Sequence, residues 1–272
     1  MGRTATPCDP VPFQKLRPAN SDLEREKASK LPYLQLVGSL LYLSVMTRPD
    51  IAYHMSVLCS MMHDPTAEAH AAALDLLLFV SNTANTTLSF SGSASAPDGP
   101  LKHYNSDTSL SPHIERNHGF VAYSDASWHK PDKLGYNMFG YVLYLYGGPI
   151  SFASKRIKVI TQSSAEAEYA AAAYACKEIA FVRKLCDFLG VGLSGPTVLA
   201  VDNKAAIEIA QNMGVTGRNK HFEDSIHYFR HLVDHQSVTP VFVSTDKQKA
   251  DGLTKPLQGG KFTDWCKWIV QR

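Results

Sequence analysis

The sequence predicts an α/β protein in which a mixed sheet is flanked by helices and preceded by a small helical region. Four observations support this fold class. Strand-like stretches follow one another between residues 120 and 154, an alanine-rich helix begins directly after them at Ser163-Ser164, and strand and helix patterns then alternate. Between residues 31 and 90, apolar residues instead recur at three- and four-residue steps, which is typical of packed helices.

The composition is that of an ordinary globular protein. The chain has 272 residues, of which 44% are hydrophobic and 19% charged, and a net charge of +2 that is too small to identify a nucleic-acid binder by charge alone. Its five cysteines include no Cys-x-x-Cys pair, which favours neither a disulfide framework nor a structural zinc site. The apolar runs are too short to span a membrane, so we expect no membrane partner and an intracellular location, in the cytoplasm or nucleus.

Changes in composition divide the chain into four segments. Residues 1–30 are rich in proline and charge and are predicted to form an extended arm. Residues 31–92 are the helical region, with helices expected over 33–43, 51–62 and 67–80. Residues 93–117 carry glycine, proline and serine and are typical of a linker. Residues 118–272 are the predicted α/β domain.

Within the α/β domain we expect strands near 120–125, 138–146 and 150–154, the last two joined by a turn at Gly147-Gly148-Pro149. Further along, the patterns predict a strand, two helices, another strand and a terminal helix, at 198–201, 204–211, 221–235, 241–243 and through Trp265 and Trp268.

The long helix that begins at Ser164 has clear start and stop signals. Ser163 can accept a bond from the backbone N–H of Glu166, and the Glu166 side chain can reach back to the Ser163 N–H. Gly190 is the expected C-cap. Glu168 has no capping role, and the small alanines around it allow another element to approach closely.

Four acidic residues fall at the ends of predicted elements: Asp125, Glu168, Asp202 and Asp251. Each has a local explanation when taken alone. Asp202 and Asp251 can cap the helix or turn that follows them, while Asp125 can end its strand and Glu168 can be a solvated helix residue. Together they predict a different role, because carboxylates from separate elements supply the hard oxygen ligands of two Mg²⁺ ions roughly 4 Å apart.

The residues around these acids resemble a known family. The segments concerned are Ala122 to Trp128, Gly148 to Ser151, Ser163 to Tyr169, Val201 to Ala206, Lys220-His221, His227 to Arg230 and Ala250 to Leu257. They resemble the ribonuclease H domain of copia-type retrotransposon Pol polyproteins. Upstream, Leu36 to Leu43 and Thr47 to Tyr53 resemble the reverse transcriptase thumb and connection region of the same polyproteins. The resemblance covers about residues 31–90 and 119–260.

This resemblance implies a fold, an activity and a site. It implies a ribonuclease H-like sheet and an endonuclease that hydrolyses the RNA strand of RNA–DNA hybrids. The catalytic and metal-binding carboxylates carry over to Asp125, Glu168, Asp202 and Asp251, with two Mg²⁺ ions as cofactors and Mn²⁺ as the alternative. The missing polymerase core is a further implied partner, since no pair of polymerase aspartates exists in this chain and polymerase activity is excluded for it alone.

The chain departs from the family pattern at several positions, and this keeps a rival interpretation open. Ser127 stands where the family has a second acidic residue, and 133–140 replaces a basic Ser-Thr-Ser-Gly segment. The alternative is a catalytically inactive retrotransposon relic that binds nucleic acid or a protein. An integrase-type site is disfavoured, because its essential glutamate would come late in the chain.

Overall fold

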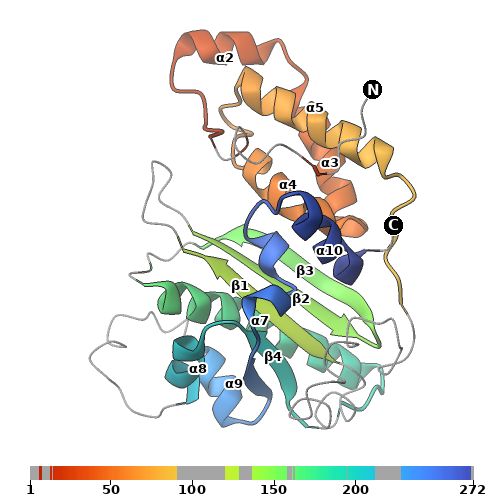
Figure 1. Cartoon of the computed structure of the whole chain (residues 1–272), viewed down its shortest axis with the longest axis vertical. Coiled ribbons are helices and arrows are strands. Elements are labelled where there is room, and N and C mark those ends of the chain that lie inside the picture. Colours follow the sequence, from red (N-terminus) through yellow and green to blue (C-terminus); the bar gives the residue numbers. More distant parts are fainter. Residues whose placement is uncertain are drawn as a thin grey trace. The chain divides into compact units, whose positions relative to one another are not determined.

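The computed structural model describes residues 6–7, 13, 15–90, 120–128, 137–157, 161, 163–193, 195–211 and 228–270. The chain divides into two compact units (Figure 1). Unit 1 comprises Met1–Leu88 together with Lys255–Arg272, and unit 2 comprises Ser89–Thr254. The linker expected over 93–117 lies outside the described residues.

Unit 1 is helical in its described part. Its elements are α2 (Asp22–Ser29), α3 (Tyr33–Met46), the short 3₁₀ helix η1 (Pro49–Ile51), α4 (Ala52–Cys59), α5 (Ala67–Asn82) and α10 (Gly259–Ile269). Buried apolar side chains of α3, α4 and α5 form the core, and the Tyr33 hydroxyl donates to the Leu58 carbonyl at 2.8 Å. The small helical packing unit that the sequence predicts between residues 31 and 90 is present.

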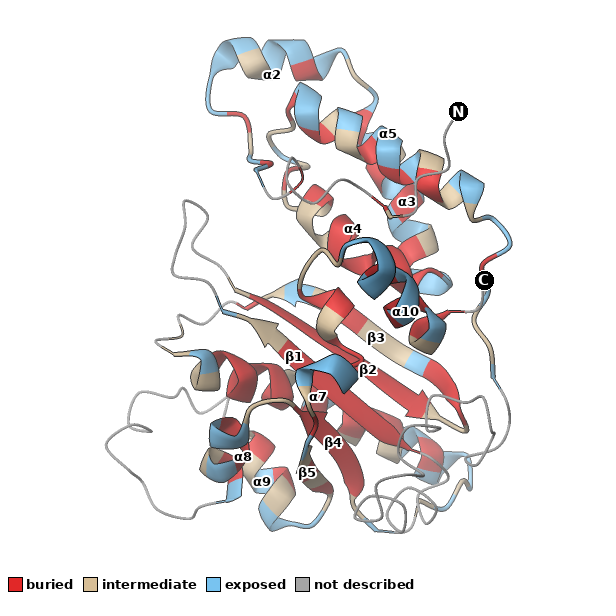
Figure 2. Cartoon of the chain, in the orientation of Figure 1, coloured by how far each residue is buried: buried red, intermediate tan, exposed pale blue. Residues whose placement is uncertain are grey.

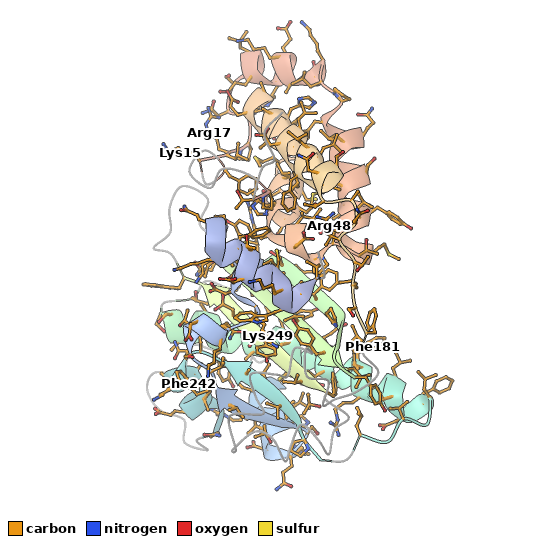
Figure 3. All side chains as sticks on the ribbon, turned by 45° about the vertical axis from the view of Figure 1, so that its right-hand side comes forward. Lys15, Arg17, Arg48, Phe181, Phe242 and Lys249 are labelled. Atoms are coloured by element: carbon orange, nitrogen blue, oxygen red, sulfur yellow. The ribbon has the colours of Figure 1, made fainter. Side chains whose placement is uncertain are left out.

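A buried ion pair holds η1 against the end of α5. The Arg48 guanidinium donates two bonds of 2.9 Å to the Asp50 carboxylate, and it also donates to the Thr83 carbonyl and hydroxyl. Arg48 is labelled in Figure 3, and both members of the pair are buried. The Thr47-Arg48-Pro49-Asp50 motif therefore has a structural role in unit 1.

The two ends of the chain differ from the segment division expected from composition. Within the predicted arm, Asp22–Ser29 forms helix α2, whose N-cap Ser21 accepts from the Glu24 N–H. Residues 255–272, expected in the α/β domain, group with the N-terminal helices, and the Phe262 ring of α10 lies 5.9 Å from the Phe79 ring of α5. The apolar face of this helix predicts that the helix packs against another element, but it does not identify that element.

In its described residues, unit 2 has a five-stranded mixed sheet with the order β3-β2-β1-β4-β5. The strands are β1 (Val121–Ser127), β2 (Met138–Leu145), β3 (Gly148–Arg156), β4 (Thr197–Val201) and β5 (Val238–Phe242). Strands β1, β2 and β3 pair antiparallel, whereas β4 pairs parallel with both β1 and β5. The prediction of a ribonuclease H-like mixed sheet flanked by helices and preceded by a helical region is confirmed.

The helices of unit 2 are α7 (Ser164–Phe188), α8 (Lys204–Gln211) and α9 (Tyr228–Asp234), with the short 3₁₀ helices η2 (Thr245–Lys247) and η3 (Asp251–Leu253) near its end. The alanine-rich side of α7 packs on alternate residues of β1 and β2, and buried side chains of α8 and α9 complete this core. Figure 2 shows β2, β4, most of β1 and the inner side of α7 as buried.

The boundaries of α7 agree with the sequence signals. Ser163 accepts from the Glu166 N–H at 3.2 Å. At the other end, Gly190 has a φ of +73°, its N–H bonds to the Asp187 carbonyl, and the Val191 N–H bonds to the Cys186 carbonyl. This pair of bonds is the Schellman arrangement, which uses the left-handed glycine to end a helix.

The turn between β2 and β3 comes one residue earlier than the sequence indicates. Tyr146 and Gly147 have φ values of +49° and +80°, and they connect Leu145 to Gly148 as a two-residue hairpin turn. Positive φ at both central residues suits the right-handed twist of paired strands. Pro149 consequently lies inside β3, which tolerates it because β3 is an edge strand.

No helix among the described residues is both long and apolar enough to cross a membrane.

Candidate metal centre

Two carboxylates lie at the same level of the sheet because of the parallel pairing of β1 with β4. The register pairs Val121 with Val198 and Tyr123 with Ala200. If this register is continued by two residues, Asp125 comes level with Asp202. The carboxyl ends of parallel strands meet at one edge of a sheet, so the strand order itself brings these two side chains together.

The third carboxylate comes from the first turns of α7. Glu168 is buried, and its Oε1 accepts a hydrogen bond of 3.1 Å from the backbone N–H of Ala126 in β1. The small side chains of Ala167 and Ala171 on the same helix are fully buried and allow α7 to lie close to the sheet. Close helix packing therefore carries Glu168 to the end of β1.

The three acidic residues form a compact group. One carboxylate oxygen from each of Asp125, Glu168 and Asp202 lies within 4.8 Å of the other two. Asp125 and Glu168 are 4% and 6% exposed, while Asp202 is half-buried. Buried carboxylates this close repel one another unless a cation offsets their charge, and a set of oxygen donors alone suits Mg²⁺ or Mn²⁺. The donor set therefore fits a hard divalent cation.

The local explanations for these acids do not account for the structure. Helix α8 is capped by Asn203, whose Oδ1 accepts from the Ala206 N–H at 3.1 Å, so Asp202 is not needed as a cap. Glu168 is not a solvated helix residue. Asp125 is placed within β1, paired with Gly140 of β2, and does not end its strand.

Asp251 is the predicted site residue that does not join the group of three. It begins η3, is half-buried, and its backbone carbonyl accepts a bond of 3.0 Å from the Thr254 hydroxyl. Thr254 in turn donates to Oδ2 of Asp125. Asp251 is thus linked to the group through Thr254, by way of its main chain.

Ser127, which replaces the family's second acidic residue, has a structural partner here. Its hydroxyl accepts from the Met138 N–H at 3.1 Å, at the position where β1 and β2 begin to pair. At this position the chain therefore has a hydroxyl that bonds to the neighbouring strand.

Sequence reasoning missed the residues that surround the acids. Thr245 donates to Oδ2 of Asp202 at 3.1 Å, and Gln248 donates through Nε2 to the Ser124 carbonyl at 2.9 Å. Lys249 is 1% exposed, and its amino group lies 5.2 Å and 5.1 Å from the ring centroids of Tyr123 and Tyr144. Burial lowers the pKa of this lysine well below its ordinary value. The only sign of these residues in the sequence was that they closely precede Asp251 and the family-like segment Ala250 to Leu257.

No protein-family model matches the chain. It is 36% identical over 239 residues to the retrovirus-related Pol polyprotein from transposon RE1 of Arabidopsis thaliana, which covers 87% of this chain and 15% of that polyprotein. It is 31% identical over 247 residues to the corresponding polyprotein from transposon TNT 1-94 of Nicotiana tabacum, which covers 91% of this chain and 17% of that polyprotein.

The chain therefore spans less than a fifth of the length of these curated relatives. Among solved structures, LC11-RNase H1, isolated from compost by a metagenomic approach, aligns with a TM-score of 0.36 and 17% identity, over 49% of this chain and 91% of that one.

Proposed function

We infer the function of this chain from its family and its carboxylates: it belongs to the retrovirus-related Pol polyproteins of transposons, and it carries a ribonuclease H-like sheet. Unit 2 is proposed to be a ribonuclease H-type endonuclease that hydrolyses the RNA strand of RNA–DNA hybrids. The observation that carries this proposal is the group of three carboxylates, from β1, α7 and the end of β4, within 4.8 Å of one another.

The proposed cofactors are two Mg²⁺ ions, for which Mn²⁺ can substitute. Asp125, Glu168 and Asp202 would hold them, with Asp251 as the fourth ligand proposed from the sequence resemblance. When bound, such ions activate a water molecule and stabilise the attacking and leaving oxygens of a phosphodiester. The chain's own contribution is to fix the carboxylates in place before substrate arrives, which the hydrogen bond from Ala126 to Glu168 supports.

Substrate binding is proposed to follow the shape and backbone of the hybrid. A hybrid offers 2′-hydroxyls and phosphates along its minor groove, so little sequence specificity is expected. Lys204 is exposed two residues after Asp202, and its ammonium lies 4.8 Å from the ring centroid of Phe242 (labelled in Figure 3). A cation held beside the carboxylates can contact a backbone phosphate. The polymerase core of the longer polyprotein is the further proposed partner.

The test is cleavage of an end-labelled RNA–DNA hybrid by the full chain, with and without Mg²⁺. We expect cleavage of the RNA strand that depends on the metal and is lost in Asp202→Asn, because the amide is a weaker ligand of nearly the same size. Asp187→Asn, an exposed change on α7, is the matched control and is expected to leave cleavage unchanged.

Three outcomes are informative. Retained cleavage in a folded Asp202→Asn protein would exclude the carboxylate site. Cleavage of the DNA strand, or of double-stranded DNA, would exclude the proposed substrate class. A folded wild-type chain without any metal-dependent cleavage would instead support the inactive relic.

A further inference from the structure

The segment Val243–Thr254, called here the 243–254 segment, contacts the proposed site from the side of the sheet that α7 does not cover. In Figure 1 its blue ribbon passes over β1 and β2, and η3 contacts both strands. Alternation along β2 explains the side: Phe139, Tyr141 and Leu143 belong to the core under α7, so Gly140 faces the other way.

The 243–254 segment supplies hydroxyl groups to two of the three clustered carboxylates. The exposed Thr245 hydroxyl donates to Oδ2 of Asp202 at 3.1 Å, and the buried Thr254 hydroxyl donates to Oδ2 of Asp125. Thr254 has a single hydroxyl proton, which is also within reach of the Asp251 carbonyl. The Asp125 carboxylate is the stronger acceptor because it is charged.

The segment is fixed by buried polar contacts before it reaches Thr254. Gln248, 1% exposed, donates to the Ser124 carbonyl and accepts from the Ala250 N–H at 3.1 Å. The next residue, Lys249, is labelled in Figure 3 and lies over two tyrosine rings of the sheet. These contacts give η3 a defined position next to β1, which a hydrogen bond to a metal ligand requires.

Gly140 makes the close approach of η3 feasible. It pairs with Asp125 across the β1–β2 ladder, and a Cβ added there would lie 2.5 Å from the Leu253 Cβ and 3.1 Å from the Thr254 Cγ2. Those distances leave no room for a side chain, so glycine is required opposite Asp125. Gly140 of β2 therefore makes room for Thr254 to reach the Asp125 carboxylate.

We propose that Thr254 is a positioning residue, which orients the Asp125 carboxylate for a divalent cation through its hydroxyl. The inference rests on the proposed function, since it needs Asp125 to be a metal ligand. Loss of a hydrogen bond that orients a metal ligand typically lowers metal affinity about 10- to 100-fold. Thr254 itself touches neither metal nor substrate in this proposal.

The test compares Thr254→Ser, which keeps the hydroxyl, with Thr254→Ala, which differs from it by that hydroxyl alone. Binding of Mn²⁺ to the full chain is measured by calorimetry without hybrid, and cleavage of hybrid is measured separately. We expect Thr254→Ala to weaken Mn²⁺ binding about 10-fold or more and to lower kcat while KM for the hybrid stays similar. Thr254→Ser is expected to stay within about 3-fold of wild type, because it can make the same bond.

Controls separate this inference from the function on which it rests. Thr263→Ala removes an exposed hydroxyl on α10 that bonds only to its own helix backbone at 3.3 Å, and it is expected to change nothing. Asp125→Asn is expected to lose Mn²⁺ binding. Equal Mn²⁺ affinity of Thr254→Ala and Thr254→Ser, with Asp125→Asn impaired, overturns the positioning role alone.

Normal Mn²⁺ binding by Asp125→Asn overturns the metal site and the inference together. The thermal melting of each variant is measured to check that it folds. If Thr254→Ala does not fold, Thr254→Cys is used in its place, because cysteine has the shape of serine but is only a weak hydrogen-bond donor. A threonine that merely fills space would show equal binding for serine and cysteine at this position.

Discussion

At the scale of single residues, the two glutamates of α7 have separate roles that follow from their positions. Residues two apart in a helix project about 200° apart, so only one of them can face the site. The Glu166 backbone N–H donates to the hydroxyl of the N-cap residue Ser163. Glu168, in contrast, is buried, and its side chain accepts from the backbone N–H of Ala126 in β1. The structure thus brings Glu168, and not Glu166, into the carboxylate group.

Glu168→Gln is expected to abolish metal-dependent cleavage of a hybrid, because the variant replaces a charged oxygen ligand with an amide. Glu166→Gln is the matched control: it keeps most activity and costs at most about 1 kcal/mol of stability, since the Ser163 cap remains. Cleavage assays and melting curves of both folded variants check this. Loss of activity in Glu166→Gln with retention in Glu168→Gln would refute the assignment of the site.

The carboxylates were predictable from the sequence, but what holds them was not. Three of the four predicted acids lie together because Asp125 is near the carboxyl end of β1, Glu168 is in the first turns of α7 and Asp202 directly follows β4. The approximate ends of elements are visible in a sequence. Thr254 and Gly140 become relevant only once the 243–254 segment is seen against β1 and β2, since their partners lie more than 100 residues away in the chain. Contacts of that sequence separation leave no periodic signal.

At the scale of elements, the buried pair of Arg48 and Asp50 fixes the connection between α3 and α4. The side chains are 5% and 0% exposed, and the guanidinium also lies 5.7 Å from the centroid of the Phe79 ring. Removing one member leaves the other charge buried without compensation. The arrangement depends on the planar fork of arginine, which makes two parallel bonds to one carboxylate.

Asp50→Asn is therefore expected to destabilise unit 1 by about 3 kcal/mol or more. Urea unfolding followed by tryptophan fluorescence measures this, because two of the three tryptophans, Trp265 and Trp268, lie in α10 of the same unit. Asp264→Asn disrupts the exposed pair with Lys267 and should cost less than about 1 kcal/mol. Equal losses in the two variants would show that burial does not decide the contribution of the Arg48 pair.

The observed ends of strands differ from the predicted ones where pairing with a neighbouring strand, and not local composition, sets the length of the strand. The strand expected at 241–243 is β5, Val238–Phe242, which contains Pro240 and begins earlier because its register with β4 extends it. Proline is accepted there since β5 is an edge strand. The helices of unit 1 and the start of α7 were predictable because caps and apolar spacing are local, whereas strand ends depend on the neighbouring strand.

At the scale of whole units, unit 1 contains a histidine that makes its stability depend on pH. His54 is 3% exposed and packs against the rings of Phe13 and Tyr53. Burial lowers its pKa to about 3, although the negative charge of Asp50 acts in the opposite direction. Between pH about 6.5 and about 3, the unfolded chain binds a proton here that the folded unit does not, so stability falls as the pH falls.

The expected loss from His54 between pH 7 and pH 5 is about 2 kcal/mol, from the proton taken up by the unfolded chain. Urea unfolding of wild type and His54→Phe at both pH values, monitored by the same fluorescence, checks this. Phenylalanine keeps the ring contacts and removes the titrating group, so the variant should lose less stability on acidification. An identical pH dependence in the two proteins would mean that folding does not lower the pKa of His54.

The composition of the two units leads to a prediction about excised fragments. From sequence, residues 118–272 are expected to fold without the N-terminal helices, but α10 groups with unit 1, where it contacts η1 and Phe79. Its buried face consists of Phe262, Trp265, Cys266 and Ile269. In a fragment of 118–272 these side chains lose their unit 1 partners, and a contiguous exposed apolar patch promotes association.

We therefore expect the 118–254 fragment to be monomeric with one cooperative melt, and the 118–272 fragment to associate or bind a hydrophobic dye at the same concentration. Size-exclusion chromatography with light scattering and thermal melting distinguish the two. The variant Phe262→Ser/Trp265→Ser in the 118–272 background is the control, since a polar face on α10 should restore the monomer. A monomeric 118–272 fragment that melts higher than 118–254 would instead place α10 in the fold of unit 2.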